Sequence, residues 1–306
     1  MGSSPGIRHR HKLPFTAFPL TRLIFSFLCW VCFLFLFPQG LTAEPPVVLA
    51  LPANEEGLAR FQQWKPITDY LTEASGSTLI LEMVEDHPSV MRGLENNLYD
   101  LAFVNPAWYV FLAERRLCEA LARPIVSGRD TFRSLLIVHR DSIVRNVDDL
   151  LGGTVALTGP SESALGYYLP LALLEAHGLS VSSYDNILFS DTFPSILKGV
   201  AYGKLDAGFV SSSVLDDRDN ASLREQVRVL LESEAIPQWT VVARPGLRRE
   251  TITAVRQALL EMGKSEQGRA ALSPTGFSAF VEASDADYNI VRRYLEAVED
   301  LVASPE

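Results

Sequence analysis

The sequence contains too few cysteines for a framework of disulfide bonds to stabilise the fold. Only three of its 306 residues are cysteines, and two of these, Cys29 and Cys32, lie in an apolar segment near the amino terminus. Cys118 is the one cysteine of residues 44–306, so an internal disulfide is excluded in that part of the chain. We interpret Cys118 as a small buried apolar residue.

The sequence also lacks the motifs of common hydrolases, nucleotide-binding enzymes and metal enzymes. It has no Gly-x-Ser-x-Gly elbow and no Gly-x-x-x-x-Gly-Lys phosphate loop. His9 and His11 belong to the amino-terminal segment, and the other three histidines, His87, His139 and His177, are too far apart in sequence for a typical metal motif. We therefore predict that the protein is not an enzyme and uses no metal or other cofactor.

Basic residues are too few for broad binding to nucleic acids or anionic membranes. The chain has 27 Lys and Arg and 37 Asp and Glu, and the first 43 residues hold 4 of the basic residues and none of the acidic ones, which leaves 23 − 37 = −14 for residues 44–306. That charge disfavours a nucleic-acid partner. It still permits an anionic ligand in a local pocket, because backbone N–H groups at helix ends bind anions.

The amino-terminal apolar run is too short for a typical membrane-spanning helix. Leu23–Phe37 has fifteen residues, whereas a spanning helix needs about 20. Four basic residues precede the run, and the small residues Thr42 and Ala43 follow it. This order is typical of a secretory signal peptide. We predict export with cleavage of the leader, residues 1–43, near Ala43; an uncleaved anchor is the alternative.

After the leader, segments typical of strands and helices alternate. Strands are predicted at 47–51, 78–84, 101–104, 134–138, 154–157, 187–189, 207–210 and 239–243. Helices are predicted from Pro66 to about 75, at 90–94, 147–151, 166–177, 192–202, 250–262, 265–272 and 287–302. This alternation predicts an α/β fold with parallel strands and helices on both faces of the sheet.

Three predicted strands run into polar or proline-bearing turns that begin helices. They end near Val104, Leu157 and Phe189, and in the stretch YDLAFVNPAWYVF the first is stopped by Asn105-Pro106. Open α/β sheets bind ligands beyond the carboxyl ends of strands, against helix N-termini. The sequence therefore predicts a ligand site at these turns.

Motifs over residues 46–290 occur in an order that resembles a known receptor family. They are PANEEGLARFQQWKPITDYLTEASG, YDLAFVNPAWYVFLAE, GGTVALTGPSESALGYYLP, VAYGKLDAGFV and SDADY. Their order and spacing resemble the periplasmic phosphate/phosphite/phosphonate-type substrate-binding proteins of ABC transporters. The resemblance implies a type 2 periplasmic binding fold, in which two α/β lobes close on a ligand.

The resemblance also implies how the chain is divided and where the protein acts. Lobe 1 is expected at 44–133 and 242–306 and lobe 2 at 134–241, with crossing hinge segments near 134–139 and 238–243. The implied function is a periplasmic receptor that captures a small phosphonate- or phosphate-like anion and delivers it to an ABC permease in the membrane. A ligand-sensing periplasmic domain acting with a sensor kinase is the alternative, and an enzyme that reuses the cleft is a weaker third.

The strand-end turns and the resemblance together give a set of candidate ligand-binding residues. They are His87, Asn105, Tyr109, Ser161, Ser163, Thr192, Phe193 and Ser211. Relatives often carry Tyr where this chain has His87, and His where it has Phe193. Of the family's three hydroxyls before Gly166, only that of Ser163 is kept.

These departures change the expected ligand. Each missing buried hydrogen-bond partner costs about 1–3 kcal/mol, so a ligand with less charge or a larger apolar body is favoured. The expected aromatic lining of the cleft is Trp108, Tyr109, Tyr167 and Phe193.

Each candidate also has an interpretation without a ligand. We weigh these as a surface-loop histidine for His87, a turn residue for Asn105, helix packing for Trp108 and Tyr109, helix caps for Ser161, Ser163 and Thr192, and a polar surface turn for Ser211.

Overall fold

The computed structural model describes residues 1–2, 45–53, 57–159, 164–178 and 186–298. Its contacts divide the chain into Met1–Glu44 and one compact unit, Pro45–Glu306. The predicted leader lies outside the described residues except for its first two, so its cleavage stays a prediction. In the part of the chain that is described, no helix has both the length and the apolar character to cross a membrane.

The compact unit is built from alternating strands and helices. The strands are β1 (Val47–Pro52), β2 (Leu79–Val84), β3 (Leu101–Val104), β4 (Glu119–Val126), β5 (Thr131–Phe132), β6 (Ser134–His139), β7 (Thr154–Thr158), β8 (Asn186–Ser190), β9 (Ala207–Ser211), β10 (Val227–Glu232), β11 (Ile236–Pro237), β12 (Thr240–Ala243) and β13 (Phe277–Glu282). The α-helices are α2 (Gly57–Ser75), α3 (His87–Glu95), α4 (Pro106–Glu114), α5 (Leu169–Glu175), α6 (Phe193–Ala201), α7 (Ser212–Asp216), α8 (Ala221–Arg224), α9 (Arg249–Glu261), α10 (Glu266–Leu272) and α11 (Asn289–Glu296).

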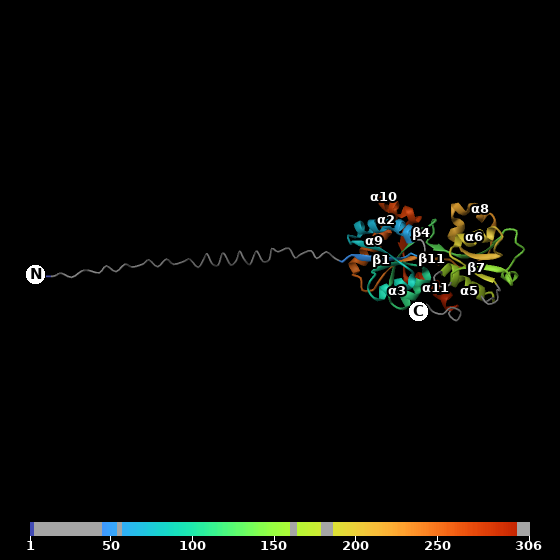
Figure 1. Ribbon diagram of the computed structural model, residues 1–306, viewed down its shortest axis with the longest axis horizontal. Helices are drawn as coiled ribbons and strands as arrows, with labels where there is room; N and C mark the ends of the chain where they lie inside the picture. Colours follow the sequence, from blue (N-terminus) through green and yellow to red (C-terminus); the bar gives the residue numbers. More distant parts are fainter. Residues whose placement is uncertain (3–44, 54–56, 160–163, 179–185, 299–306) are drawn as a thin grey trace. The chain divides into compact units, whose positions relative to one another are not determined.

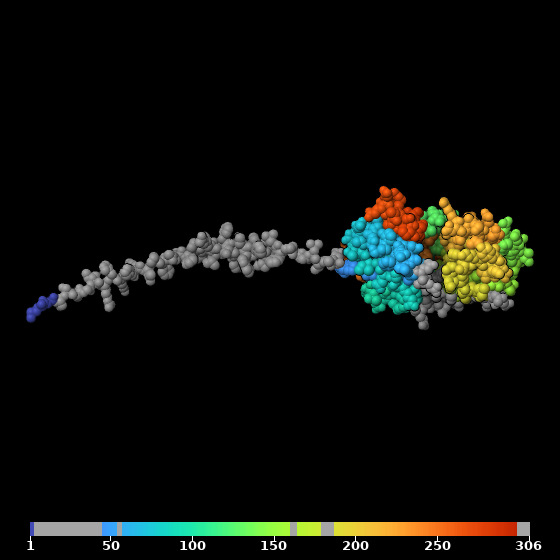
Figure 2. Space-filling view, turned by 45° about the horizontal axis from the view of Figure 1, so that its top comes forward, coloured from blue at the N-terminus to red at the C-terminus, as the bar shows by residue number. Residues whose placement is uncertain are grey.

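The strands form two main sheets, which confirms the predicted α/β class. The first sheet has the order β13-β4-β12-β3-β1-β2 and the second has the order β10-β6-β9-β7-β8. β1, β2 and β3 pair in parallel, as do β7, β8 and β9. The predicted parallel pairing is therefore present in both sheets, while the remaining strands pair antiparallel and make the sheets mixed. Figure 2 shows blue and orange-red segments, from the two ends of the unit, on one half and yellow and green segments, from its middle, on the other.

A short two-stranded ribbon, which we call the crossing ribbon, links the sheets. It consists of β5 and β11, with Phe132 opposite Ile236, and β11 lies between the two sheets in Figure 1. The ribbon lies just before the predicted hinge segments at 134–139 and 238–243, in which Ser134 pairs with β9 and Thr240 with β3. The predicted lobe limits stay predictions; the one at 241–242 falls inside β12.

Strand register brings the carboxyl edges of both sheets to the crossing ribbon. At the end of β3, Val104 pairs with Thr240, which follows the ribbon strand β11 closely. At the end of β9, Ser211 pairs with Ser134, which follows the ribbon strand β5 closely. Because β1, β2, β7 and β8 run parallel to these strands, their carboxyl ends lie at the same edges. The predicted strand-to-helix turns therefore gather around the ribbon from both sides.

Helix α2 begins earlier than predicted. Pro66 was expected at its first turn but lies inside the helix, which starts at Gly57. An internal proline costs a helix hydrogen bond, about 3 kcal/mol. Trp64, in the turn before the proline, packs on Phe103 with ring centroids 4.5 Å apart, and this contact offsets part of that cost.

One hydrophobic cluster reaches from the first sheet into the second. It includes Val104 of β3 and Leu157 of β7. Phe111 of α4 contacts Tyr168, which precedes α5, with ring centroids 5.9 Å apart. Helix α11 packs against both α4 and α5. The two halves of the unit, each built on one of the two main sheets, therefore touch through apolar side chains as well as through the ribbon.

Candidate ligand site at the sheet edges

Asn105 shapes the turn that ends β3. It is the N-cap of α4, and its side-chain oxygen accepts hydrogen bonds from the backbone N–H groups of Ala107 (3.0 Å) and Trp108 (3.1 Å). Pro106 follows at the first helical position, where its missing N–H is not needed. The turn role considered for Asn105 is confirmed, and its contact with a ligand stays a prediction.

His87 lies in the protein interior at the start of α3. It is 1% exposed, so its interpretation as a surface-loop histidine was wrong. Its ring stacks on Trp108 with centroids 5.5 Å apart and 12° between planes, and Trp239 packs against it at 5.4 Å. The backbone N–H of Asn105 donates to His87 Nε2 over 3.5 Å. His87 therefore joins the turn after β2 to the turn after β3.

Tyr109 and Trp108 both pack into the interior from α4. Trp108 is 0% and Tyr109 1% exposed, which confirms the packing interpretation of both. The Tyr109 hydroxyl donates to Asp285 Oδ1 at 2.8 Å, and its ring lies 4.2 Å from that of Tyr288. Burial, together with this carboxylate, raises the pKa of Tyr109, so the hydroxyl remains a donor. A ligand contact by Tyr109 stays a prediction.

The second sheet contributes capped helix starts at its own carboxyl edge. The Thr192 hydroxyl accepts from the backbone N–H of Ser195 at 3.3 Å and caps α6, whose first residue is Phe193. Ser211 is 3% exposed and caps α7 by accepting from the backbone N–H of Ser213. The cap predicted at Thr192 is confirmed, and a surface position for Ser211 was wrong. Ser161 and Ser163 lie outside the described residues.

Gly166 allows a close approach at the same edge. A Cβ at this position would lie 1.9 Å from Thr158 Oγ1 and 2.9 Å from a ring carbon of Phe193. A side chain here would therefore push α6 and the end of β7 apart. Beside it, Tyr167 lies 6.2 Å from Phe189, which is 53% exposed. Aromatic rings thus gather at the second-sheet edge.

Two residues near the ribbon were not among the candidates. Trp239, which joins β11 to β12, was predicted only as a strand residue, and Arg60 of α2 was given no role. The Arg60 guanidinium carbon lies 5.7 Å from the centre of the Trp239 ring, and its Nη1 donates to the carbonyl of Pro52 at 2.9 Å. Because these residues are far apart in sequence, no local pattern indicates the pairing.

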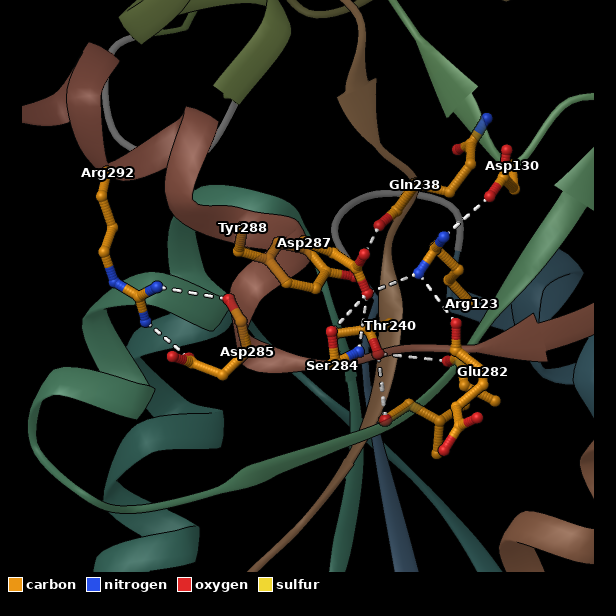
Figure 3. Close-up of polar contacts among 12 residues, drawn as sticks. Arg123, Asp130, Gln238, Thr240, Glu282, Ser284, Asp285, Asp287, Tyr288 and Arg292 are labelled. Carbon is orange, nitrogen blue, oxygen red and sulfur yellow. Dashed lines mark hydrogen bonds and ion pairs between the residues drawn. The ribbon is translucent and has the colours of Figure 1, made fainter.

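A polar network holds the first-sheet end of the crossing ribbon (Figure 3). Arg123 of β4 forms ion pairs with Asp130 (2.8 Å) and Asp287 (2.9 Å) and donates to the carbonyl of Glu282 (2.8 Å). Asp287 also accepts from the backbone N–H (2.7 Å) and hydroxyl (2.9 Å) of Ser284. The Arg123 side chain is 13% exposed, so its charge is largely screened from water by the protein.

The same network reaches the second ribbon strand. The Tyr288 hydroxyl donates to the carbonyl of Gln238 at 3.1 Å, and the Gln238 backbone N–H donates to the carbonyl of Asp130 at 3.0 Å. Arg292 also pairs with Asp285 at 2.6 Å. The SDADY segment, one motif of the family resemblance, therefore fixes both ribbon strands to the first sheet.

The network predicts a loss of stability in acid. Burial opposes the shift, but hydrogen bonds from Ser284 and the charge of Arg123 lower the pKa of Asp287. The hydrogen bond from Arg292 in the same way lowers the pKa of Asp285. A carboxylate with a lowered folded pKa stabilises the fold above its unfolded pKa, and this contribution disappears as the pH falls through the folded value. We expect stability to decrease below about pH 4.

Urea unfolding of the wild type and Asp287→Asn at pH 7, 5 and 3 measures this effect. The variant should be less stable than the wild type at pH 7 and should lose less stability between pH 5 and 3. Parallel pH profiles for the two proteins would contradict the assignment to Asp287.

Comparisons with known proteins give a consistent pattern. A family model described as "ABC transporter, phosphonate, periplasmic substrate-binding protein" matches residues 50–288. The phosphonates-binding periplasmic protein of Escherichia coli K12 is 23% identical over 244 residues, which are 76% of this chain and 70% of that protein.

Solved structures show the same fold at low sequence identity. A binding protein component of an ABC phosphonate transporter from Pseudomonas aeruginosa has a TM-score of 0.67 at 19% identity and covers 82% of this chain and 85% of its own. PhnD1 from Prochlorococcus marinus, in complex with methylphosphonate, has a TM-score of 0.68 at 13% identity, covering 82% and 97%.

Proposed function

The chain belongs to the family of periplasmic phosphonate substrate-binding proteins of ABC transporters, and on that premise we propose that it captures a phosphonate-type anion between its two sheets and delivers it to a membrane permease. The observation that carries the proposal is the register of the two sheets, which brings both carboxyl edges to the crossing ribbon. A ligand held there would contact both halves of the unit at once, which is the arrangement that couples binding to hinge closure.

The chemistry at these edges suits an oxyanion. Helices α4 and α6 both begin at the carboxyl end of a strand, where the positive end of the helix dipole favours negative charge, although the caps Asn105 and Thr192 already accept from N–H groups of the first turns. Hydroxyls of Thr158, Thr192 and Ser211 lie at the same edge of the second sheet. These neutral donors permit anion binding despite the net negative charge of the chain.

The family match favours a transport receptor over the sensory alternative. The methylphosphonate of PhnD1 supports a ligand with a phosphorus–carbon bond as the first choice for this chain. A receptor of this kind binds and releases its ligand unchanged, so no turnover is expected.

A thermal-shift experiment tests the ligand assignment. The purified protein is heated with methylphosphonate, phosphite, phosphate, methanesulfonate or acetate at constant ionic strength. A ligand at about 100 times its Kd adds about 2.7 kcal/mol to the stability, which raises the Tm of a domain of this size by about 5–10 °C. We expect the largest rise with methylphosphonate. If none of the five anions raises the Tm, the proposed ligand class is wrong.

A further inference from the structure

Arg60 points from α2 back toward the edge of the first sheet. Its Nη1 donates to the carbonyl of Pro52, the last residue of β1, at 2.9 Å. Its guanidinium carbon lies 5.7 Å from the centre of the Trp239 ring. The side chain is half-buried, and the carbonyl of Pro52 and the indole of Trp239 are among the contacts that position its charge. A guanidinium keeps its charge at any physiological pH and offers a planar fork of donors for an oxyanion.

Trp239 is a half-buried indole with rigid support behind it. It packs against His87 and Phe103, each with ring centroids 5.4 Å away. Both supporting residues are buried, at 1% and 6% exposure. An indole held in this way offers a fixed apolar face at little cost in side-chain entropy.

The position of this pair matters because of where Trp239 lies in the chain. It lies two residues after the end of β11 of the crossing ribbon and precedes Thr240, which pairs with Val104 at the carboxyl end of β3. Arg60 reaches the carboxyl end of β1, and β1 is the neighbour of β3. The guanidinium and the indole therefore lie together at the edge where the first sheet meets the ribbon.

The charge of the whole chain makes a local cation important. Residues 44–306 carry −14, and such a field repels small anions from most of the surface. A guanidinium at the sheet edge offsets this repulsion locally and adds a charge-assisted hydrogen bond, which is roughly twice as strong as a neutral one.

We infer that Arg60 and Trp239 form the first-sheet part of the ligand site, with the guanidinium binding the oxyanion and the indole packing on its organic substituent. This inference rests on the proposed function and narrows it. The site selects an organic phosphonate or sulfonate with an apolar substituent over inorganic phosphate. Tyr167, Phe189 and Phe193 lie at the second-sheet edge, and we assign to them the apolar surface that meets the same substituent from the other half.

Isothermal titration of the full protein with methylphosphonate and phenylphosphonate tests the inference. Arg60→Gln should weaken binding of both probes by about 10–100-fold, the loss expected for a charged hydrogen bond. Arg60→Lys should recover part of the lost affinity, because lysine keeps the positive charge but lacks the planar pair of N–H donors of a guanidinium. Arg249→Gln is the matched control, since it removes the same charge from an exposed ion pair with Glu119 on the same half, and it should change affinity less than about 2-fold.

Trp239→Leu tests the indole separately. It should reduce the preference for phenylphosphonate over methylphosphonate by about 5–10-fold, which corresponds to loss of one aromatic contact, while methylphosphonate affinity changes little. The inference is overturned if Arg60→Gln binds both probes with normal affinity. It is also overturned if Trp239→Leu keeps the wild-type preference for phenylphosphonate over methylphosphonate. Either result leaves the proposed function intact. Failure of the wild type to bind either probe would overturn both.

Discussion

Trp108→Ala is expected to lower the free energy of unfolding by about 3–5 kcal/mol, the cost of truncating a buried Trp. The side chain is 0% exposed and contacts rings on two sides, His87 at 5.5 Å and Phe111 at 5.6 Å. Truncation leaves a cavity between α3 and α4 and removes the support on which His87 stacks. The measurement is urea unfolding followed by circular dichroism at pH 7.

Trp108→Phe is the matched variant. The indole Nε1 has no hydrogen-bond partner among the described residues, so phenylalanine removes no hydrogen bond and keeps most of the ring contact. We expect it to cost about 1–2 kcal/mol, because some volume is lost. If the Ala variant loses less than the Phe variant, the role assigned to the ring stack is wrong.

Arg123→Met is expected to cost about 2–3 kcal/mol. Removal of one partner of a buried ion pair costs about 3–5 kcal/mol, and we reduce this figure because Asp130 and Asp287 are 40% and 35% exposed. The variant leaves two carboxylates close together without their shared cation, and it also loses the bond to the Glu282 carbonyl. Chemical unfolding at pH 7 gives the value directly.

Arg129→Met provides the control for this prediction. Arg129 forms one ion pair with Asp216 at 2.9 Å, and its side chain is 62% exposed. Exposed pairs contribute about 0–1 kcal/mol, so this substitution removes the same charge at small cost. Equal losses for the two variants would show that the network in Figure 3 is no more than a set of surface pairs.

The sequence predicted correctly those helix starts and strands that are marked by neighbouring residues in the chain. Thr192 was recognised as a cap because its hydroxyl precedes a helix, and β3 was recognised as an apolar run stopped by Asn105-Pro106. β4 and β13 were missed because neither is a continuous apolar run: EALARPIV contains Arg and Pro, and FSAFVE contains Ser and Glu. Both lie beside each other at the sheet margin, where pairing with a neighbour stabilises a strand that its own composition does not indicate.

The site was only partly predictable for a related reason. His87 was selected from the resemblance, but its burial depends on Trp108 and Trp239, which approach it from α4 and from the link between β11 and β12. Arg60 and Trp239 are brought together only by the order of strands in the first sheet. Contacts between residues so far apart depend on the whole fold, and a single sequence contains no periodic signal for them.

The apolar contact between the halves also bears on affinity. Phe111 meets Tyr168, and α11 packs on helices of both halves, so any rotation of one half against the other must slide or break this contact. If the two halves close on the ligand as proposed, the populations of the more open and more closed arrangements depend on residues that lie apart from the ligand. Because an observed Kd is the intrinsic Kd divided by the fraction of molecules able to bind, α11 belongs to the set of elements that determine how tightly this receptor holds its ligand.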